Sequence, residues 1–138
     1  MGGHSAKLDA QSDRNCIDHS FGEIKIFFRE HPCISLYRTL IEYREMNYTI
    51  RFSIATIEMP DRNTAAGLYA LFVRDGTGDI IPLSPQEGKY RHVPFVSTES
   101  KTTLHGTVVS TIRSQAVGRT PGADVLASLA TSVLFSLD

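Results

Sequence analysis

The segment Tyr48–Met59, which reads YTIRFSIATIEM, has the clearest pattern in this chain of 138 residues. Ile50, Phe52 and Ile54 alternate with polar residues, so in an extended backbone they project to one side and the residues between them to the other. This alternation predicts a β-strand with one buried face. We expect its apolar face to lie in the core, and the expected neighbours there are Ile24, Leu40 and Leu71.

Three features precede this strand. Residues 1–15 are polar and without periodicity, which predicts a flexible N-terminal tail. Residues 23–28 alternate apolar and polar side chains, which predicts a second strand, ended by Pro32 because proline lacks the donor that a strand ladder needs. Between residues 34 and 46 the apolar spacing changes to three and four, which predicts an amphipathic helix.

After Tyr48–Met59 the apolar runs are short and separated by turn residues. Glycines at 76 and 78 predict a tight hairpin turn, because glycine readily adopts the positive φ of such turns. The predicted strands are 68–74, 79–83, 89–98 (interrupted by Pro94) and 104–112. Residues 125–137 fit a helical stripe and also alternate as a strand does; their length and alanines favour a helix.

These elements predict an α+β fold. Consecutive strands joined by short turns form an antiparallel sheet, here of five to six strands. The sheet packs with one helix near residues 34–46 and a C-terminal helix, and residues 16–138 form a single globular domain after the tail. A closed or sandwiched sheet is the alternative.

The composition is that of an ordinary globular domain, with 41% hydrophobic residues, 21% charged residues and a net charge of −1. It excludes fibrous repeats and disorder as well as a role dominated by charge, such as the coating of DNA. No apolar run reaches the roughly 20 residues of a membrane span, and residues 1–15 lack the apolar core of a signal peptide. We expect an intracellular protein, cytoplasmic or nuclear, with no membrane span.

Two cysteines are too few for a disulfide scaffold, so we expect Cys16 and Cys33 to be reduced. Together with His19 and His31 they have the residue types of a zinc site. The strand predicted between the two Cys/His pairs would hold them apart, at about 3.3 Å per residue. Either cysteine could instead pair in space with a histidine as a nucleophile. We find no phosphate loop or dinucleotide motif and expect no cofactor.

Positive charge is concentrated between residues 88 and 123, where the only acid is Glu99. Aromatic side chains lie among the basic ones, and such a mixture can contact phosphates while it stacks bases. The candidate nucleic-acid-binding residues are Lys89, Arg91, Lys101, Arg113 and Arg119. RNA or polyanion binding by residues 88–119 requires that these side chains share one face.

The segment between Asp124 and Asp138 carries no charge, whereas a surface helix normally has a charged outer face. Either its own domain buries it or a second subunit covers it. The candidate self-association residues are Val125, Leu126, Leu129, Val133, Phe135 and Leu137.

The leading functional hypothesis is a non-enzymatic structural or interaction domain that self-associates or docks a macromolecule. A β-rich chain with a polar tail and no catalytic cluster is typical of viral coat or matrix proteins, a similarity of style alone. RNA binding is the first alternative, and a small enzyme with a Cys/His or zinc site is the second. The expected partners are further copies of the chain or RNA.

Overall fold

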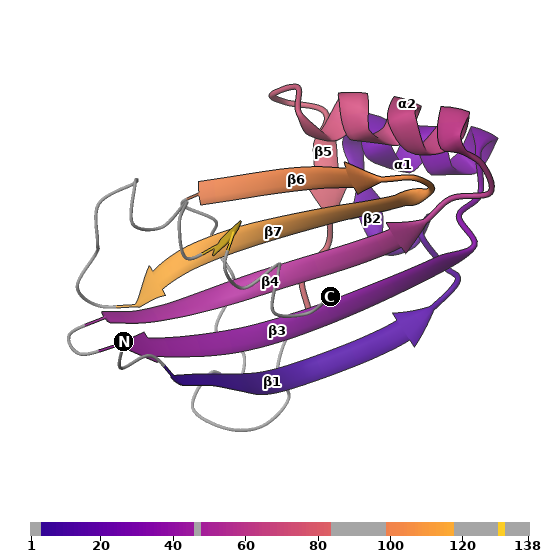
Figure 1. Cartoon of the computed structure of the whole chain (residues 1–138). Helices are drawn as coiled ribbons and strands as arrows, with labels where there is room; N and C mark the ends of the chain where they lie inside the picture. The colour runs from indigo at the N-terminus through magenta and orange to yellow at the C-terminus, as the bar shows by residue number, and fades with distance from the viewer. Residues whose placement is uncertain (1–3, 46–47, 84–98, 118–129, 132–138) are drawn as a thin grey trace.

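The computed structural model describes residues 4–45, 48–83, 99–117 and 130–131. Five antiparallel strands form one sheet in the order β1-β3-β4-β7-β6 (Figure 1). Their bounds are β1 (His4–Asp13), β3 (Ser35–Glu45), β4 (Tyr48–Glu58), β6 (Glu99–His105) and β7 (Val108–Val117).

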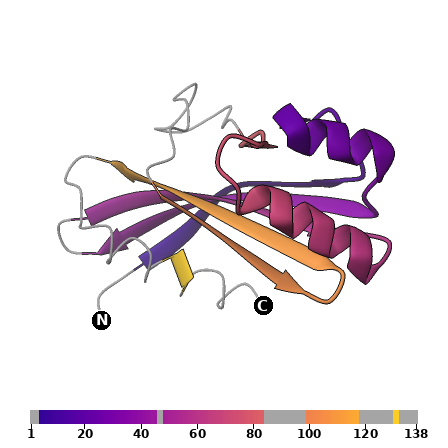
Figure 2. The ribbon, with the colours of Figure 1, turned by 90° about the horizontal axis from the view of Figure 1, so that it is seen from above.

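Helices α1 (Gly22–Glu30) and α2 (Arg62–Phe72) lie over one face at one end of the sheet (Figure 2). A two-stranded sheet of β2 (Ser20–Phe21) and β5 (Gly78–Ile80) lies beside them. The architecture is a mainly antiparallel α+β fold, as predicted.

The strand predicted from Tyr48 to Met59 is confirmed as β4, the central strand of the sheet. Ile50, Phe52 and Ile54 are fully buried, as expected. They belong to a cluster on the sheet face that points away from the helices, which we call the outer cluster. Its buried members are Ile41, Ile50, Phe52, Ile54, Ile112 and Ala130.

A second cluster, the helix-side cluster, fills the space between the sheet and the two helices. The sheet contributes Leu36, Ile57 and Val109, while each helix contributes a buried pair four residues apart. These helical pairs are Ile24 with Phe28 and Leu68 with Phe72. Ile24 and Leu71 pack in this cluster, so the prediction that they neighbour Phe52 is wrong. Leu40 is buried, but it lies opposite Ser53 and points to the helix side, so it does not share the face of Phe52 either.

The predicted flexible tail is wrong for residues 4–13, which form β1. This strand pairs with β3 from His4, opposite Arg44, to Asp13, opposite Leu36. Main-chain hydrogen bonds to a neighbouring strand do not depend on side-chain hydrophobicity. A polar segment at the edge of a sheet therefore has no apolar pattern to reveal it.

The strand predicted at residues 23–28 is wrong, because this segment is helix α1. Ile24 and Phe28 are buried, whereas Ile26 is 52% exposed. In a helix, residues four apart share a face and the residue midway between them faces away. The three alternating apolar residues fit both a strand and a helix, and packing against the sheet selects the helix.

The helix predicted at residues 34–46 is also wrong, because this segment is strand β3. Residues 38–42 are all buried, since the helix-side and outer faces of the central sheet are both covered. Each face of β3 mixes apolar with polar residues, as Leu40 and Arg38 do on the helix side, so this strand lacks the alternation that identifies a strand with one apolar face. The apolar spacing of three and four therefore arose without a helix.

The strand predicted at residues 68–74 is wrong, because residues 68–72 form the C-terminal half of α2 and residues 73–74 follow its end. Asp61 caps this helix, and its Oδ1 accepts a hydrogen bond from the Thr64 N–H at 2.8 Å. The turn at residues 75–78 has the expected positive φ at both glycines, +80° and +100°, but leads from α2 into β5 rather than closing a hairpin. Of the next predicted strand, 79–83, only Asp79 and Ile80 lie in a strand, β5.

The single strand predicted at residues 104–112 is a hairpin of β6 and β7. Its loop is Gly106-Thr107, between the paired residues His105 and Val108, and Gly106 has φ +63°. The strand predicted at 89–98 lies outside the described residues. Of the helix predicted at 125–137 the structure describes only Ala130 and Thr131, and both are helical. No helix in the described part of the chain is long and apolar enough to cross a membrane.

Candidate functional site

A cavity of about 630 Å³ runs along β6, the strand at one edge of the sheet. In the described ranges β7 is the only strand that pairs with β6, and Figure 2 looks onto this edge. Residues 101–105 of β6 line the cavity together with Tyr69 of α2. The other lining residues are Thr56, Val108, Ser110 and Thr131. We call this cavity the β6 groove.

Side chains from both faces of β6 enter the groove. Lys101 and His105 lie opposite Ile112 and Val108 and share the outer face of the sheet with Ile112. Leu104 lies opposite Val109 and packs against the helix-side cluster. Because the groove is lined from both faces, it encloses the outer edge of the strand, where main-chain groups point away from β7.

The groove is rich in hydroxyl groups and carries positive charge. The Lys101 Nζ donates a hydrogen bond to Thr131 Oγ1 at 2.7 Å, and Lys101 and His105 are both exposed. No carboxylate is among its lining residues in the described part of the chain. Hydroxyls, a cation and a free strand edge together suit an extended ligand that brings carboxylates.

A second polar region lies on the helix-side face of the sheet, beyond the helices, where Arg38 is buried. Its Nη1 donates to the Ile81 carbonyl oxygen at 3.0 Å, and its Nη2 donates to Gln11 Oε1 at 2.5 Å. Burial lowers the pKa of Arg38, while nearby Asp13 and Asp9 raise it. Arginine nevertheless stays protonated in proteins. Its bonds to the protein give Arg38 a structural role that joins β1, β3 and the segment after β5.

The neighbouring charged side chains have internal partners too. Arg51 donates from Nε to Gln115 Oε1 at 3.1 Å, and Arg113 forms an ion pair with Asp79 of β5. A cavity of about 380 Å³ beside Arg38 is lined by Asp9 and His19 as well, so it holds charges of both signs. This region therefore has less electrostatic selectivity for a ligand than the β6 groove.

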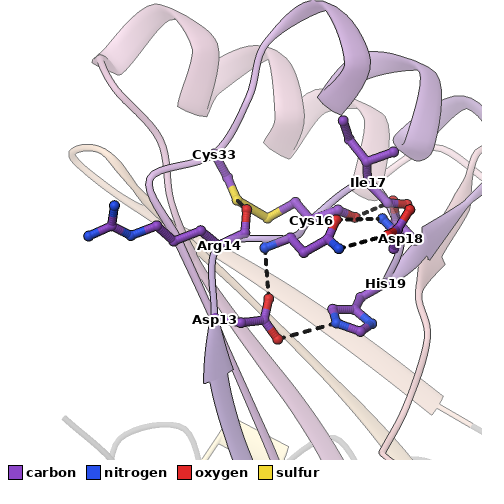
Figure 3. The surroundings of a disulfide bond; sticks show 9 residues. Asp13, Arg14, Cys16, Ile17, Asp18, His19 and Cys33 are labelled. Atoms are coloured by element: carbon purple, nitrogen blue, oxygen red, sulfur yellow. Dashed lines mark hydrogen bonds and ion pairs between the residues drawn. A yellow bond between two sulfur atoms is a disulfide. The ribbon is translucent and has the colours of Figure 1, made fainter.

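Cys16 and Cys33 form a disulfide, so the prediction of reduced thiols is wrong (Figure 3). The bond joins the loop after β1 to the segment between α1 and β3. A helix rises only about 1.5 Å per residue, less than half the rise of a strand. The sequence between the cysteines is helical rather than extended, which allows them to meet. Persistent disulfides are typical of oxidising compartments, which removes reduced cysteines as an argument for an intracellular location.

The same bond takes both sulfurs away from the candidate zinc site. His19 lies beside Asp13, with Nε2 and Oδ2 3.2 Å apart, and His31 packs on the Phe27 ring with centroids 4.7 Å apart. Among the described residues, no group of three or more His, Cys, Asp or Glu side chains could hold a metal ion.

The structure describes two of the five basic residues proposed for RNA binding and does not bring them together. Lys101 lies opposite Ile112, the residue before Arg113, so the Lys101 and Arg113 side chains point to opposite faces of the sheet. Arg113 is 17% exposed and paired with Asp79. The others, Lys89, Arg91 and Arg119, lie outside the described residues.

The six apolar residues proposed for self-association, Val125, Leu126, Leu129, Val133, Phe135 and Leu137, also lie outside the described residues. Ala130, within that segment, is 3% exposed and packs in the outer cluster. At this residue the apolar segment is therefore covered by the sheet of its own chain.

Comparison with known proteins found no matching family model, no matching curated protein and no matching solved structure. Functional inference for this chain therefore rests on its geometry.

Proposed function

We propose that this chain is a non-enzymatic interaction domain that binds an extended segment of a partner protein as an added strand along β6. The β6 groove, which encloses the open edge of this strand from both faces, is the observation that supports the proposal. In strand addition the main-chain hydrogen bonds supply affinity, and pockets for alternate side chains supply specificity.

The lining of the groove defines the partner's chemistry. Lys101 and His105 are four residues apart on one face of β6, about 13 Å along a strand. A partner strand with acidic residues at the same spacing would place a carboxylate near each of them. On the other face Leu104 and Tyr69 suit an apolar residue at an alternate position. We therefore propose an acidic segment with alternating apolar residues.

RNA binding has less support. It needs a shared basic face, whereas Lys101 and Arg113 point in opposite directions and Asp79 neutralises Arg113. Binding of a partner strand in the β6 groove, by contrast, requires only the residues that already line the groove.

The test uses a short labelled peptide, capped at both ends, in which aspartate and valine alternate. We expect saturable binding by fluorescence anisotropy, and slower amide exchange in residues 101–105 when the peptide is bound. Lys101→Glu should weaken binding at least about tenfold, since it replaces an attraction by a repulsion. The matched control, Lys25→Glu on α1, makes the same charge change away from the groove and should bind normally.

Two further peptides test the mode of binding. Lysine in place of aspartate should abolish binding by the parent and restore it in Lys101→Glu. N-methylation of the amides on one edge of the aspartate peptide should abolish binding, because it removes main-chain donors. Equal binding of the aspartate and lysine peptides, or unchanged affinity in Lys101→Glu, would overturn the proposal.

A further inference from the structure

The sheet has a second open edge, formed by β1 at the end opposite β6 (Figure 1). β3 is its only partner within the described ranges, and the ten residues of β1 are exposed except Leu8, Asp9 and Asp13, which are half-buried. We propose that two copies of the chain pair antiparallel along β1 to form one continuous sheet. This inference uses none of the residues of the β6 groove.

The bulge in β1 determines which residues share a face. The pairing with β3 shifts between Lys7 and Asp9, so Leu8 is an extra residue. Before the bulge, Lys7 lies on the outer face, opposite Ile41; after it, Ala10 lies on the same face, opposite Thr39. Without the bulge, two residues three apart would point to opposite faces.

In the proposed dimer, β1 of one copy runs antiparallel to β1 of the other about a two-fold axis perpendicular to the sheet. Residues that lie opposite each other across this interface must point to the same face of the sheet. The bulge allows this in a register that uses the whole strand, with the axis between Leu8 and Asp9. Lys7 then faces Ala10 of the second copy on the outer face. His4 faces Asp13 of the second copy on the helix side, because these residues lie opposite Arg44 and Leu36 of β3.

The charges of β1 are complementary in this register. Its first half carries His4 and Lys7, and its second half carries Asp9 and Asp13. Antiparallel pairing brings the basic half of one strand alongside the acidic half of the other. On the helix side His4 of each copy faces Asp13 of the second copy, whereas Lys7 lies on the outer face. A charged residue such as Lys7 usually protects an edge strand from association. Here it meets the small side chain of Ala10, and its Nζ donates to Tyr37 Oη at 3.3 Å on its own chain.

The pairing closes on itself, because each copy uses the same edge. The dimer would present one β6 groove at each end of the extended sheet. Head-to-tail pairing of β1 with β6 would instead give an open filament and would block the grooves.

The test is sedimentation velocity of the full chain over about a hundredfold range of concentration, since mass action makes a reversible dimer concentration-dependent. We expect a monomer–dimer equilibrium. Ala10→Lys places like charges opposite each other at two symmetry-related positions and should raise the dimer dissociation constant at least about tenfold. Ala10→Glu should lower that constant, because the new carboxylate faces Lys7 of the second copy.

The charge-swapped double variant Lys7→Glu with Ala10→Lys should restore dimerisation relative to Ala10→Lys alone, which a simple loss of structure would not do. Each variant should melt near the parent temperature, because both positions are exposed. Lys101→Glu should leave the dimer unchanged. A monomer at all concentrations, assembly beyond a dimer, or equal dissociation constants for Ala10→Lys and Ala10→Glu would overturn the proposal.

Discussion

At the scale of single residues, two glycines meet where the small sheet joins α1. Gly22 and Gly78 form an isolated bridge, and both have positive φ. A Cβ at Gly78 would lie 2.0 Å from the Phe21 carbonyl oxygen, and one at Gly22 would lie 2.8 Å from the Thr77 carbonyl oxygen. Close approach of two backbones, as well as turn geometry, therefore requires glycine here.

We expect Gly78→Ala to be much more destabilising than Gly76→Ala. Both positions have positive φ, +100° and +80°, which costs an L-residue about 1–2 kcal/mol. Only at Gly78 does the added methyl group also collide with backbone, whereas nothing lies within 4 Å of it at Gly76. Urea unfolding of both variants measures the difference. Equal losses of unfolding free energy in the two variants would contradict the close contact between the backbones at Gly78 and Phe21.

Asp61 gives a prediction about pH. The hydrogen bond from the Thr64 N–H lowers the pKa of this carboxyl group. A lowered pKa in the folded state adds stability that is complete above the usual pKa and is lost as the pH falls through the lowered value. Asp61→Ala should therefore lower the melting temperature more at neutral pH than near pH 2. Asp61→Asn, which keeps a capping oxygen without the charge, is the control.

At the scale of elements, α1 is held in place near both ends by bonds to neighbouring loops. At its start, the Ile24 N–H donates to the Thr77 carbonyl oxygen at 3.0 Å. Just beyond its end, Cys33 is bonded to Cys16 in the loop after β1 (Figure 3). Along its length Ile24 and Phe28 pack in the helix-side cluster. The disulfide thus reinforces a helix that is short and has no side-chain cap at its N-terminus.

Reduction of the disulfide should destabilise the fold by about 3 kcal/mol, the amount expected for a closed loop of this length, with 17 residues of separation. Chemical unfolding with and without reductant measures the effect. The double variant Cys16→Ser with Cys33→Ser should have the stability of the reduced parent and should not respond to reductant. If reductant leaves the parent unchanged, the disulfide has no stabilising role.

At the scale of the whole molecule, the described residues form a sheet that is covered on both faces and whose two edge strands each pair with a single described strand. Helices cover one end of one face, and the described turn at Ala130 and Thr131 lies on the other face (Figure 2). The open edges, β1 and β6, lie at opposite ends of the strand order. Self-pairing at one edge and partner binding at the other are therefore compatible in one molecule.

Ala130→Asp should destabilise the chain strongly, because it places a charge in the outer cluster, where Ala130 is 3% exposed. The matched control is Ala66→Asp, the same change at an exposed position on α2. Thermal unfolding should show a large loss for the first variant and a small one for the second. Equal melting temperatures would mean that Ala130 does not pack against the sheet.

The local sequence pattern predicted β4 correctly, because three apolar residues alternate with polar ones. The structure keeps this segment extended because the strands on both sides of it are long and pair with it along its length. The sequence also predicted positive φ at Gly76 and Gly78 and the antiparallel α+β class. The pattern predicted a strand where the structure has α1 and a helix where it has β3. Ile24, Ile26 and Phe28 fit either element. In β3 both faces mix apolar and polar residues, so no alternation marks it as a strand.

The candidate sites depended still more on tertiary structure. Sequence alone identified Lys101 as basic, but only the register with β7 shows that it and Arg113 point apart. Gly106 was the local signal that could have revealed β6 as a separate edge strand. Nothing local marks β1, since an edge strand is held by its neighbour's main chain. The sequence thus determined which segments are apolar enough to be buried, because burial depends on composition. The disulfide, the two open edges and the β6 groove were decided by which segments become neighbours, and that depends on long-range packing.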